Sequence, residues 1–339
     1  MSNKKIVFLR VDFSRKKYLS FGHLFRIYKI IDLLPKNKFS FFIITKSNKF
    51  NSKFLKPNIR FIKISNDKKN FYKNTFKKHN PDFLIVDLPY NEFNFKKISK
   101  NKTKIIVIDD HLKNFSIADY YINPNLLHNK DIKLIKQKQK KYKFKIFTGL
   151  NYFVNYHNYY GEKLFNVRKK IYNILINFGG SDPLNLTNKL IKKIYLHNNY
   201  SNLNFHFLFG PGFPRKNQKR IKKKNFFYYQ NLSQKMLDQL KFMCDLALTS
   251  GGNIMLENLK IGLPNLCIGT SPNEIKNIKI LSKDNLVYKI TLKTVPNVLL
   301  NINSLFTFKY RKKINNKLKI IFKKNYFSSL INQILNQIF

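Results

Sequence analysis

Short runs of apolar residues recur along the chain, separated by longer stretches whose apolar positions lie three or four residues apart. Runs of β-branched and aromatic residues that alternate with helical spacing are typical of parallel sheets joined by crossover helices. In the first half, strands are predicted at 5–11, 39–45, 59–64, 83–88, 104–109 and 119–123. Helices are predicted in several of the gaps, notably around 23–34 and 68–79.

The same alternation restarts after a polar stretch, rich in lysine and tyrosine, at about 129–170. Strands are predicted at 172–178, 204–210, 225–230, 245–250 and 265–269, with helices near 183–196, 233–243 and 254–261. This pattern favours two α/β domains with a cleft between them, because ligands of open parallel sheets bind outside the carboxyl ends of the strands. We predict an N-terminal Rossmann-like domain at 1–165, a C-terminal one at 166–310, and a helical segment at 311–339 that braces the two.

The composition is that of a folded protein, since 43% of the 339 residues are hydrophobic and 33 are phenylalanine. The net charge of +48, from 65 Lys and Arg against 17 Asp and Glu, would suit a nucleic-acid or membrane partner. The lysines are spread along the chain, however, and their excess accompanies that of Asn, Ile, Phe and Tyr, as AT-rich codons produce. We therefore expect no stable nucleic-acid partner and leave open a weak association with a membrane surface.

Several kinds of site are not supported by the sequence. Cys244 and Cys267 are too few and too far apart for a disulfide framework or a zinc site, and the seven histidines lack metal-ligand spacing. The dinucleotide-binding and Walker glycine motifs are absent. The first apolar run is too short for a signal peptide, and no run approaches the roughly 20 apolar residues of a membrane span. We expect a monomeric cytoplasmic protein that uses neither metal nor cofactor.

Glycine and acidic residues are rare in this chain, but they occur together in "TSGGNIMLENLKIGLP" at 249–264. Gly251 and Gly252 permit close backbone approach, and the helix that follows presents free N–H groups that can bind a phosphate. Glu257 lies one turn after Asn253, where its carboxylate could accept hydrogen bonds from a vicinal diol such as a ribose. A nucleotide satisfies both features, and an ordinary glycine turn followed by an exposed glutamate is the alternative.

A second loop of this design follows the strand at 172–178. Gly179 and Gly180 precede Ser181 or Asp182, predicted as the N-cap of a helix whose first residue is Pro183. A well-capped turn without a ligand is the alternative.

The N-terminal domain offers a candidate base. Gly22 and His23 open a helix that carries Arg26 one turn later, and the helix dipole disfavours the protonated form of a histidine at a helix start. A neutral His23 could activate water, with Asp12 and Arg26 nearby. A purely structural histidine is the alternative.

Further polar residues are predicted at the carboxyl ends of strands in the same domain, where they face the ligand side of a parallel sheet. They are Arg10, Asp12, Ser14, Asp87, Asp109 and Asp110. Asp87, Asp109 and Asp110 could instead cap the segments that follow them.

These motifs together resemble those of the UDP-sugar hydrolases of pseudaminic acid biosynthesis and of related spore-coat polysaccharide proteins. That family is close in fold to the peptidoglycan N-acetylglucosaminyltransferase. Its R-x-D-x-S, G-x-G-H-x-x-R and E-x-x-x-x-G-x-P motifs are matched in order, between about residues 5 and 285, except that Ser20 replaces the first glycine of G-x-G-H. The matching residues are Arg10, Asp12, Ser14, Gly22, His23, Arg26, Glu257, Gly262 and Pro264.

The resemblance implies a GT-B-like fold, with two Rossmann-like domains whose parallel sheets face across a cleft and UDP held by the C-terminal one. It implies that His23, with Asp12, activates water to release a free 6-deoxy-diacetamido-hexose and UDP. The substrate-binding residues that it implies are Arg10, Ser14, Gly22, Arg26, Asp87, Gly179, Gly180, Gly251, Gly252, Asn253, Ile254, Glu257 and Asn273. One departure is Glu274, which follows Asn273 where the family has glutamine.

Three functions remain after this comparison. Hydrolysis of a UDP-sugar is favoured, because the N-terminal motif contains a histidine and lacks the longer glycine run of the peptidoglycan enzyme. Transfer of the sugar to a surface polysaccharide is the first alternative. A non-catalytic basic binding protein is the second, based on the basic, amphipathic C-terminal segment at 309–339.

Overall fold

The computed structural model describes residues 4–13, 21–46, 59–65, 68–99, 102–125, 127–154, 166–197, 199–322, 330–331 and 333–334. The chain divides into two compact units. Unit 1 comprises 1–156 and 325–339, and unit 2 comprises 157–324.

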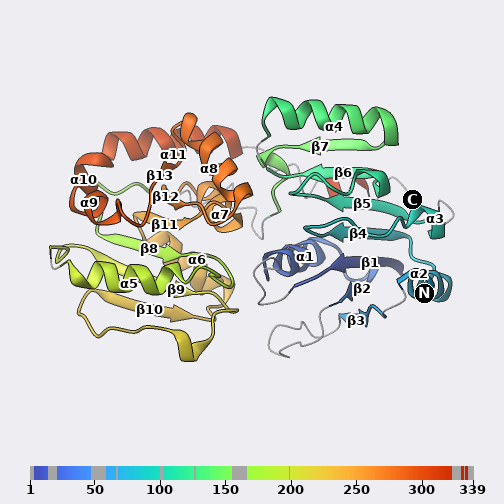
Figure 1. Ribbon diagram of the computed structural model, residues 1–339, viewed down its shortest axis with the longest axis horizontal. Helices are drawn as coiled ribbons and strands as arrows, with labels where there is room; N and C mark the ends of the chain where they lie inside the picture. Colours follow the sequence, from blue (N-terminus) through green and yellow to red (C-terminus); the bar gives the residue numbers. More distant parts are fainter. Residues whose placement is uncertain are drawn as a thin grey trace. The chain divides into compact units, whose positions relative to one another are not determined.

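Unit 1 contains a parallel sheet whose strands follow the order β3-β2-β1-β4-β5-β6-β7, as the labels in Figure 1 show. Its strands are β1 (Lys5–Val11), β2 (Phe39–Thr45), β3 (Arg60–Lys63), β4 (Phe83–Asp87), β5 (Lys104–Ile108), β6 (Tyr120–Asn123) and β7 (Lys145–Thr148). Its helices are α1 (Phe21–Leu33), α2 (Lys68–His79), α3 (Lys96–Ser99) and α4 (Asn129–Tyr142), with short 3-10 turns η2 (Phe115–Ile117) and η3 (Leu150–Tyr152).

Alternate residues of the unit 1 strands enter two apolar layers, which explains why these runs are apolar throughout. Val7 and Leu9 of β1 pack on the face covered by α1, which also receives Leu330, Ile331 and Ile334. Phe8, between them, packs on the opposite face with Tyr72 and Phe76 of α2. Helices therefore cover both faces of the sheet.

Unit 2 repeats the same architecture, with strand order β10-β9-β8-β11-β12-β13. Its strands are β8 (Asn173–Asn177), β9 (Asn204–Phe209), β10 (Phe226–Gln230), β11 (Leu246–Ser250), β12 (Asn265–Ile268) and β13 (Tyr288–Lys289). Its helices are α5 (Leu186–Leu196), α6 (Gln234–Met243), α7 (Asn253–Lys260), α8 (Pro272–Lys283), α9 (Val295–Leu300), α10 (Ile302–Leu305) and α11 (Phe308–Phe322), and η4 (Arg215–Asn217) is a 3-10 turn.

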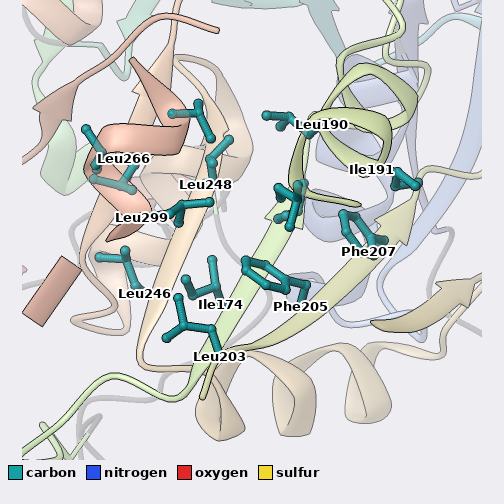
Figure 2. Close-up of a cluster of buried hydrophobic side chains, with 14 of the residues drawn as sticks. Ile174, Leu190, Ile191, Leu203, Phe205, Phe207, Leu246, Leu248, Leu266 and Leu299 are labelled. Carbon is teal, nitrogen blue, oxygen red and sulfur yellow. The ribbon is translucent and has the colours of Figure 1, made fainter. Parts of the chain in front are cut away.

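The core of unit 2 lies between α5 and one face of this sheet. Figure 2 shows Leu190 and Ile191 of α5 beside Phe207 of β9, with Phe205 of the same strand and Ile174 of the neighbouring β8. A second layer on the opposite face includes Leu240 of α6 and Ala247 of β11. The predicted α/β class with parallel sheets is thus confirmed in both units.

The polar stretch predicted at 129–170 contains regular structure that its composition hides. Helix α4 begins at a capping box, in which His128 and Asp131 satisfy each other's backbone N–H groups, and ends at Lys143 in the left-handed conformation. β7 then adds a parallel edge strand beside β6. Lysines dominate the exposed face of α4, and they obscure the apolar positions, such as the buried Ile135, that would have indicated a helix.

The C-terminal segment predicted at 311–339 falls in both units. Helix α11 belongs to unit 2, where the side chain of Asn315 donates to the carbonyl of Gly262 and the Arg311 side chain donates to the carbonyls of Phe306, Arg168 and Lys169. Leu330, Ile331 and Ile334 lie in the core of unit 1.

Candidate functional site

In each unit, several of the residues predicted from the sequence follow the two strands between which the strand order reverses direction. Strands β1 and β4 are neighbours in unit 1, and their connections leave toward opposite sides of the sheet. β8 and β11 have the same relation in unit 2. Ligands of doubly wound sheets bind outside the carboxyl ends of such strand pairs. Asp87 ends β4, and Gly251 follows β11 directly.

His23, in the first turn of α1, contacts Asp87 at the end of β4. The distance from His23 Nδ1 to Asp87 Oδ1 is 2.7 Å, and the histidine side chain is 11% exposed. With the ring N–H at Nδ1 donating to this carboxylate, Nε2 carries the lone pair that can take up a proton. The aspartate thus fixes the orientation of the imidazole, as in other His–Asp pairs.

Arg26 also binds Asp87, and its Nη2 lies 3.3 Å from His23 Nδ1. Its Nε donates to Asp87 Oδ2 at 2.7 Å and its Nη2 to Asp87 Oδ1 at 2.5 Å, in a two-point contact. Burial alone would raise the pKa of Asp87, but the charges and hydrogen bonds of Arg26 and His23 hold that pKa well below its usual value. Asp87 is therefore an anion at neutral pH.

Asp110, which follows β5, completes this cluster. It pairs with Arg26 at 2.8 Å and accepts a hydrogen bond from the side chain of Asn125. Burial lowers the pKa of the adjacent His111, and the charge of Asp110 opposes that effect. His111 and Asn125 were not among the predicted site residues. They follow β5 and β6, and only the strand order β4-β5-β6 shows that the ends of these strands lie near Asp87.

Asp109 has a structural role in the same loop. Its carboxylate accepts backbone N–H bonds from His111, Lys113 and Asn114, at 2.6–2.8 Å. It thereby shapes the turn that presents Asp110.

Asp12 lies in a separate network from that of His23. Arg10 is fully buried and donates through Nη1 and Nη2 to both oxygens of Asp12, at 2.6 and 2.8 Å. The same guanidinium pairs with Glu92 at 2.7 Å and donates through Nε to the Tyr72 hydroxyl at 2.9 Å. Glu92 lies 82 residues from Arg10 and was not predicted.

The remaining bonds to Asp12 tie together the ends of neighbouring strands. It accepts hydrogen bonds from the backbone N–H of Lys46 at 2.6 Å, the hydroxyl of Thr45 and the hydroxyl of Tyr90. Burial would raise the pKa of Asp12, but the Arg10 ion pair and the Lys46 N–H lower it. The contacts of Arg10 and Asp12 therefore join β1, β2 and the loop after β4.

In unit 2, the loop after β8 packs against the loop after β9. A Cβ on Gly210 would overlap the backbone oxygens of Gly179 and Gly180, and Gly212 N–H donates to Gly180 O at 2.7 Å. Gly179 itself has a φ of +84°, which favours glycine.

The predicted helix start after this loop is wrong. Helix α5 begins at Leu186 and not at Pro183, because the Asp182 carboxylate accepts the N–H groups of Leu186 and Thr187 at 2.8 Å each. Those amides already have an anionic partner, so the start of α5 differs from that of α7.

Helix α7 begins at Asn253, directly after the glycine pair, so its N-cap residue is Gly252, which has no side chain to cap it. A Cβ on Gly251 would overlap the backbone oxygen of Glu274, so the glycine lets the starts of α7 and α8 approach each other. A Cβ on Gly252 would meet only the Glu274 carboxylate, at 2.9 Å. Glu274 in turn accepts hydrogen bonds from the N–H and hydroxyl of Thr270.

Glu257, on the second turn of α7, forms an ion pair with Lys241 of α6. Lys241 Nζ lies 2.9 Å from Glu257 Oε2, and the two side chains are 4% and 14% exposed. The glutamate is thus less exposed than its sequence context alone suggests. Lys241 gave no sequence signal, since it is one lysine among many.

The other predicted residues are placed as follows. Gly22 and Ile254 are half-buried in the first turns of α1 and α7, whereas Asn273 is exposed in the first turn of α8. Ser14 lies outside the described residues. Within the described ranges, no three His, Cys, Asp or Glu side chains group as a metal site would require. The same part of the chain contains no helix with the length and apolar character of a membrane span.

No known protein-family model matches this sequence. An uncharacterized protein of Methanocaldococcus jannaschii is 29% identical over 263 residues, which cover 73% of this chain and 52% of that protein. The chain thus spans about half the length of this curated relative.

Solved structures match almost the whole chain. Phytolacca americana UGT2 in complex with UDP-2-fluoro-glucose and pterostilbene superposes with a TM-score of 0.64 at 10% identity, covering 99% of this chain and 100% of that one. Acinetobacter baumannii MurG gives 0.61 at 10% identity (98% and 99%), and S. aureus MnaA with UDP gives 0.59 at 10% identity (97% and 96%). The chain therefore has the GT-B type of fold, built from two Rossmann-like α/β units.

Proposed function

We propose that this protein is an enzyme that hydrolyses a UDP-activated sugar, with His23 as the base that activates water. The observation that carries the proposal is the 2.7 Å contact between His23 and a buried Asp87 that Arg26 keeps ionised. A histidine oriented in this way is suited to general-base catalysis. The substrate class that we propose, from the motifs shared with the pseudaminic acid hydrolases, is a UDP-linked deoxy-diacetamido-hexose.

In the proposed reaction, His23 Nε2 accepts a proton from water while the water oxygen bonds to the anomeric carbon. The bond from that carbon to the diphosphate oxygen breaks, and its electron pair leaves with UDP. Asp87 remains ionised and stabilises the imidazolium that forms. The products are the free sugar and UDP.

Unit 2 would bind the nucleotide. We propose that the diphosphate receives hydrogen bonds from the first amides of α7, at Asn253 and Ile254, since this helix start has no side-chain cap. Glu257, one turn further along α7, would accept hydrogen bonds from the ribose hydroxyls. The motifs shared with the hydrolase family further suggest Gly179, Gly180 and Asn273 as contacts of the substrate.

The roles that we propose for Arg10 and Asp12 follow from their burial. Their side chains are 0% and 2% exposed, and they bond to each other and to residues of β2 and the loop after β4. They would hold the ends of β1, β2 and β4 in register and so support the position of Asp87.

Sugar transfer is the second candidate, because the same fold occurs in MurG and in the plant protein UGT2. Transfer requires the same base and the same leaving group as hydrolysis. It differs in the nucleophile, which would be an acceptor hydroxyl.

The test is release of UDP from UDP-sugars, measured with and without polysaccharide acceptors, by the parent protein and by His23→Ala. Loss of about 10²–10⁴-fold in rate is expected for removal of a general base. His197→Ala, at the exposed C-cap of α5, is the matched control and should retain full activity. Release that depends on an acceptor would favour transfer, and full activity of His23→Ala would exclude this base.

A further inference from the structure

Lys241 is one of three buried lysines among the described residues, together with Lys29 and Lys260. It lies on α6 beside Leu240, and its side chain is only 4% exposed. Transferring an ammonium group out of water is unfavourable unless an anion compensates it. Glu257 supplies that anion at 2.9 Å.

The ion pair joins two helices at a specific place. Lys241 reaches from the last turn of α6, while Glu257 lies on α7 one turn after Asn253. Asn253 is the first residue of a helix that starts on Gly252 without a side-chain cap. The fixed carboxylate therefore lies one turn from the amides that we propose as the diphosphate site.

We propose that Lys241 is a positioning residue for ribose recognition, acting through Glu257. This inference rests on the proposed binding of UDP by unit 2. A glutamate has three rotatable side-chain bonds, and the ion pair with Lys241 limits their freedom. A carboxylate held in place in this way can accept hydrogen bonds from ribose hydroxyls without first being ordered.

A purely structural role would tie α6 to α7 and have no bearing on the sugar. The two roles differ in a measurable way. A structural tie affects the affinity for every uridine nucleotide equally, whereas a positioning role affects only nucleotides that carry ribose hydroxyls.

The experiment is calorimetric titration with UDP and with 2′,3′-dideoxyuridine diphosphate. The parent protein should bind UDP about 10–100-fold more tightly, since hydrogen bonds to a charged group contribute at that level. In Lys241→Met this preference should fall to about threefold or less, with affinity for the dideoxy nucleotide unchanged. Lys241→Arg keeps the charge and should retain most of the preference.

Lys235→Met is the matched control, because Lys235 is exposed on the same helix. It should bind both nucleotides as the parent does. Thermal unfolding checks that each variant is folded, and Lys241→Gln replaces Lys241→Met if the latter is not.

The outcomes separate the two proposals. Equal weakening of both nucleotides, or an unchanged preference in Lys241→Met, would overturn the role of Lys241 and leave UDP binding intact. A parent protein that binds UDP without preferring the ribose hydroxyls would do the same. A parent protein that binds no UDP would overturn the proposed function and this inference together.

Discussion

Asp87→Asn tests the proposed catalytic pair most directly. The substitution removes a buried negative charge that contacts Arg26 at 2.7 and 2.5 Å and His23 at 2.7 Å. An asparagine keeps one acceptor oxygen, and its NH₂ group takes the place of the other as a donor. At the Oδ2 position this group would face Arg26 Nε, and at the Oδ1 position it would face His23 Nδ1 and Arg26 Nη2. In either orientation His23 loses the negative charge of its partner.

The expected loss of rate is about 10²–10⁴-fold, the usual contribution of a positioned general base. This corresponds to roughly 3–5 kcal/mol of transition-state stabilisation. The free energy of unfolding should fall by about 3 kcal/mol, at the low end for a broken buried ion pair. Arg26 keeps its partner Asp110 at 2.8 Å, which limits the stability loss.

UDP release measures the first effect and urea unfolding the second, with His23→Ala and the double variant alongside. Residues that act as a unit are not additive, so Asp87→Asn should reduce the rate of His23→Ala by no more than about threefold. A full additional loss in the double variant would refute the idea that Asp87 acts through His23.

Three further predictions concern other parts of the chain. Burial lowers the pKa of His206 to about 4, whereas the unfolded chain takes up this proton at about pH 6.5. The neutral histidine therefore contributes its full stability above about pH 6.5, and the free energy of unfolding should fall by about 3 kcal/mol as the pH drops to about 4. Urea unfolding across this range should show the slope, and His206→Gln should flatten it. Gly251→Ala should lower the free energy of unfolding by about 1–3 kcal/mol, since its Cβ would overlap the backbone of Glu274. In Gly252→Ala the new Cβ would approach the carboxylate end of the Glu274 side chain, and the loss in the same unfolding assay should be less than half as large. UDP affinity should change little between 50 and 200 mM salt, whereas a nucleic-acid binder with six or more phosphate contacts would lose about 10³-fold, which a salt titration of each ligand distinguishes.

The sequence alone determined most of the secondary structure that carries the site. Strands 5–11 and 39–45 and helix 68–79 were predicted with the observed bounds, because each is a local pattern of apolar spacing between turn residues. The turns that contain the glycine pairs after β8 and β11 were also predicted, since glycine is scarce in this chain and a glycine pair directly after a strand is a local signal of a turn. Helix α4 and strand β7 were missed because lysines obscure their short apolar faces.

Only the tertiary structure decided which residues are partners. His23 and Asp87 are 64 residues apart, Arg10 and Glu92 are 82 apart, and Lys241 and Glu257 belong to different helices. These contacts exist because the strand orders bring β4 beside β1 and β11 beside β8. A sequence pattern reports which face of an element is apolar, but the choice of partner depends on which strands become neighbours, and that is settled by packing of the whole unit.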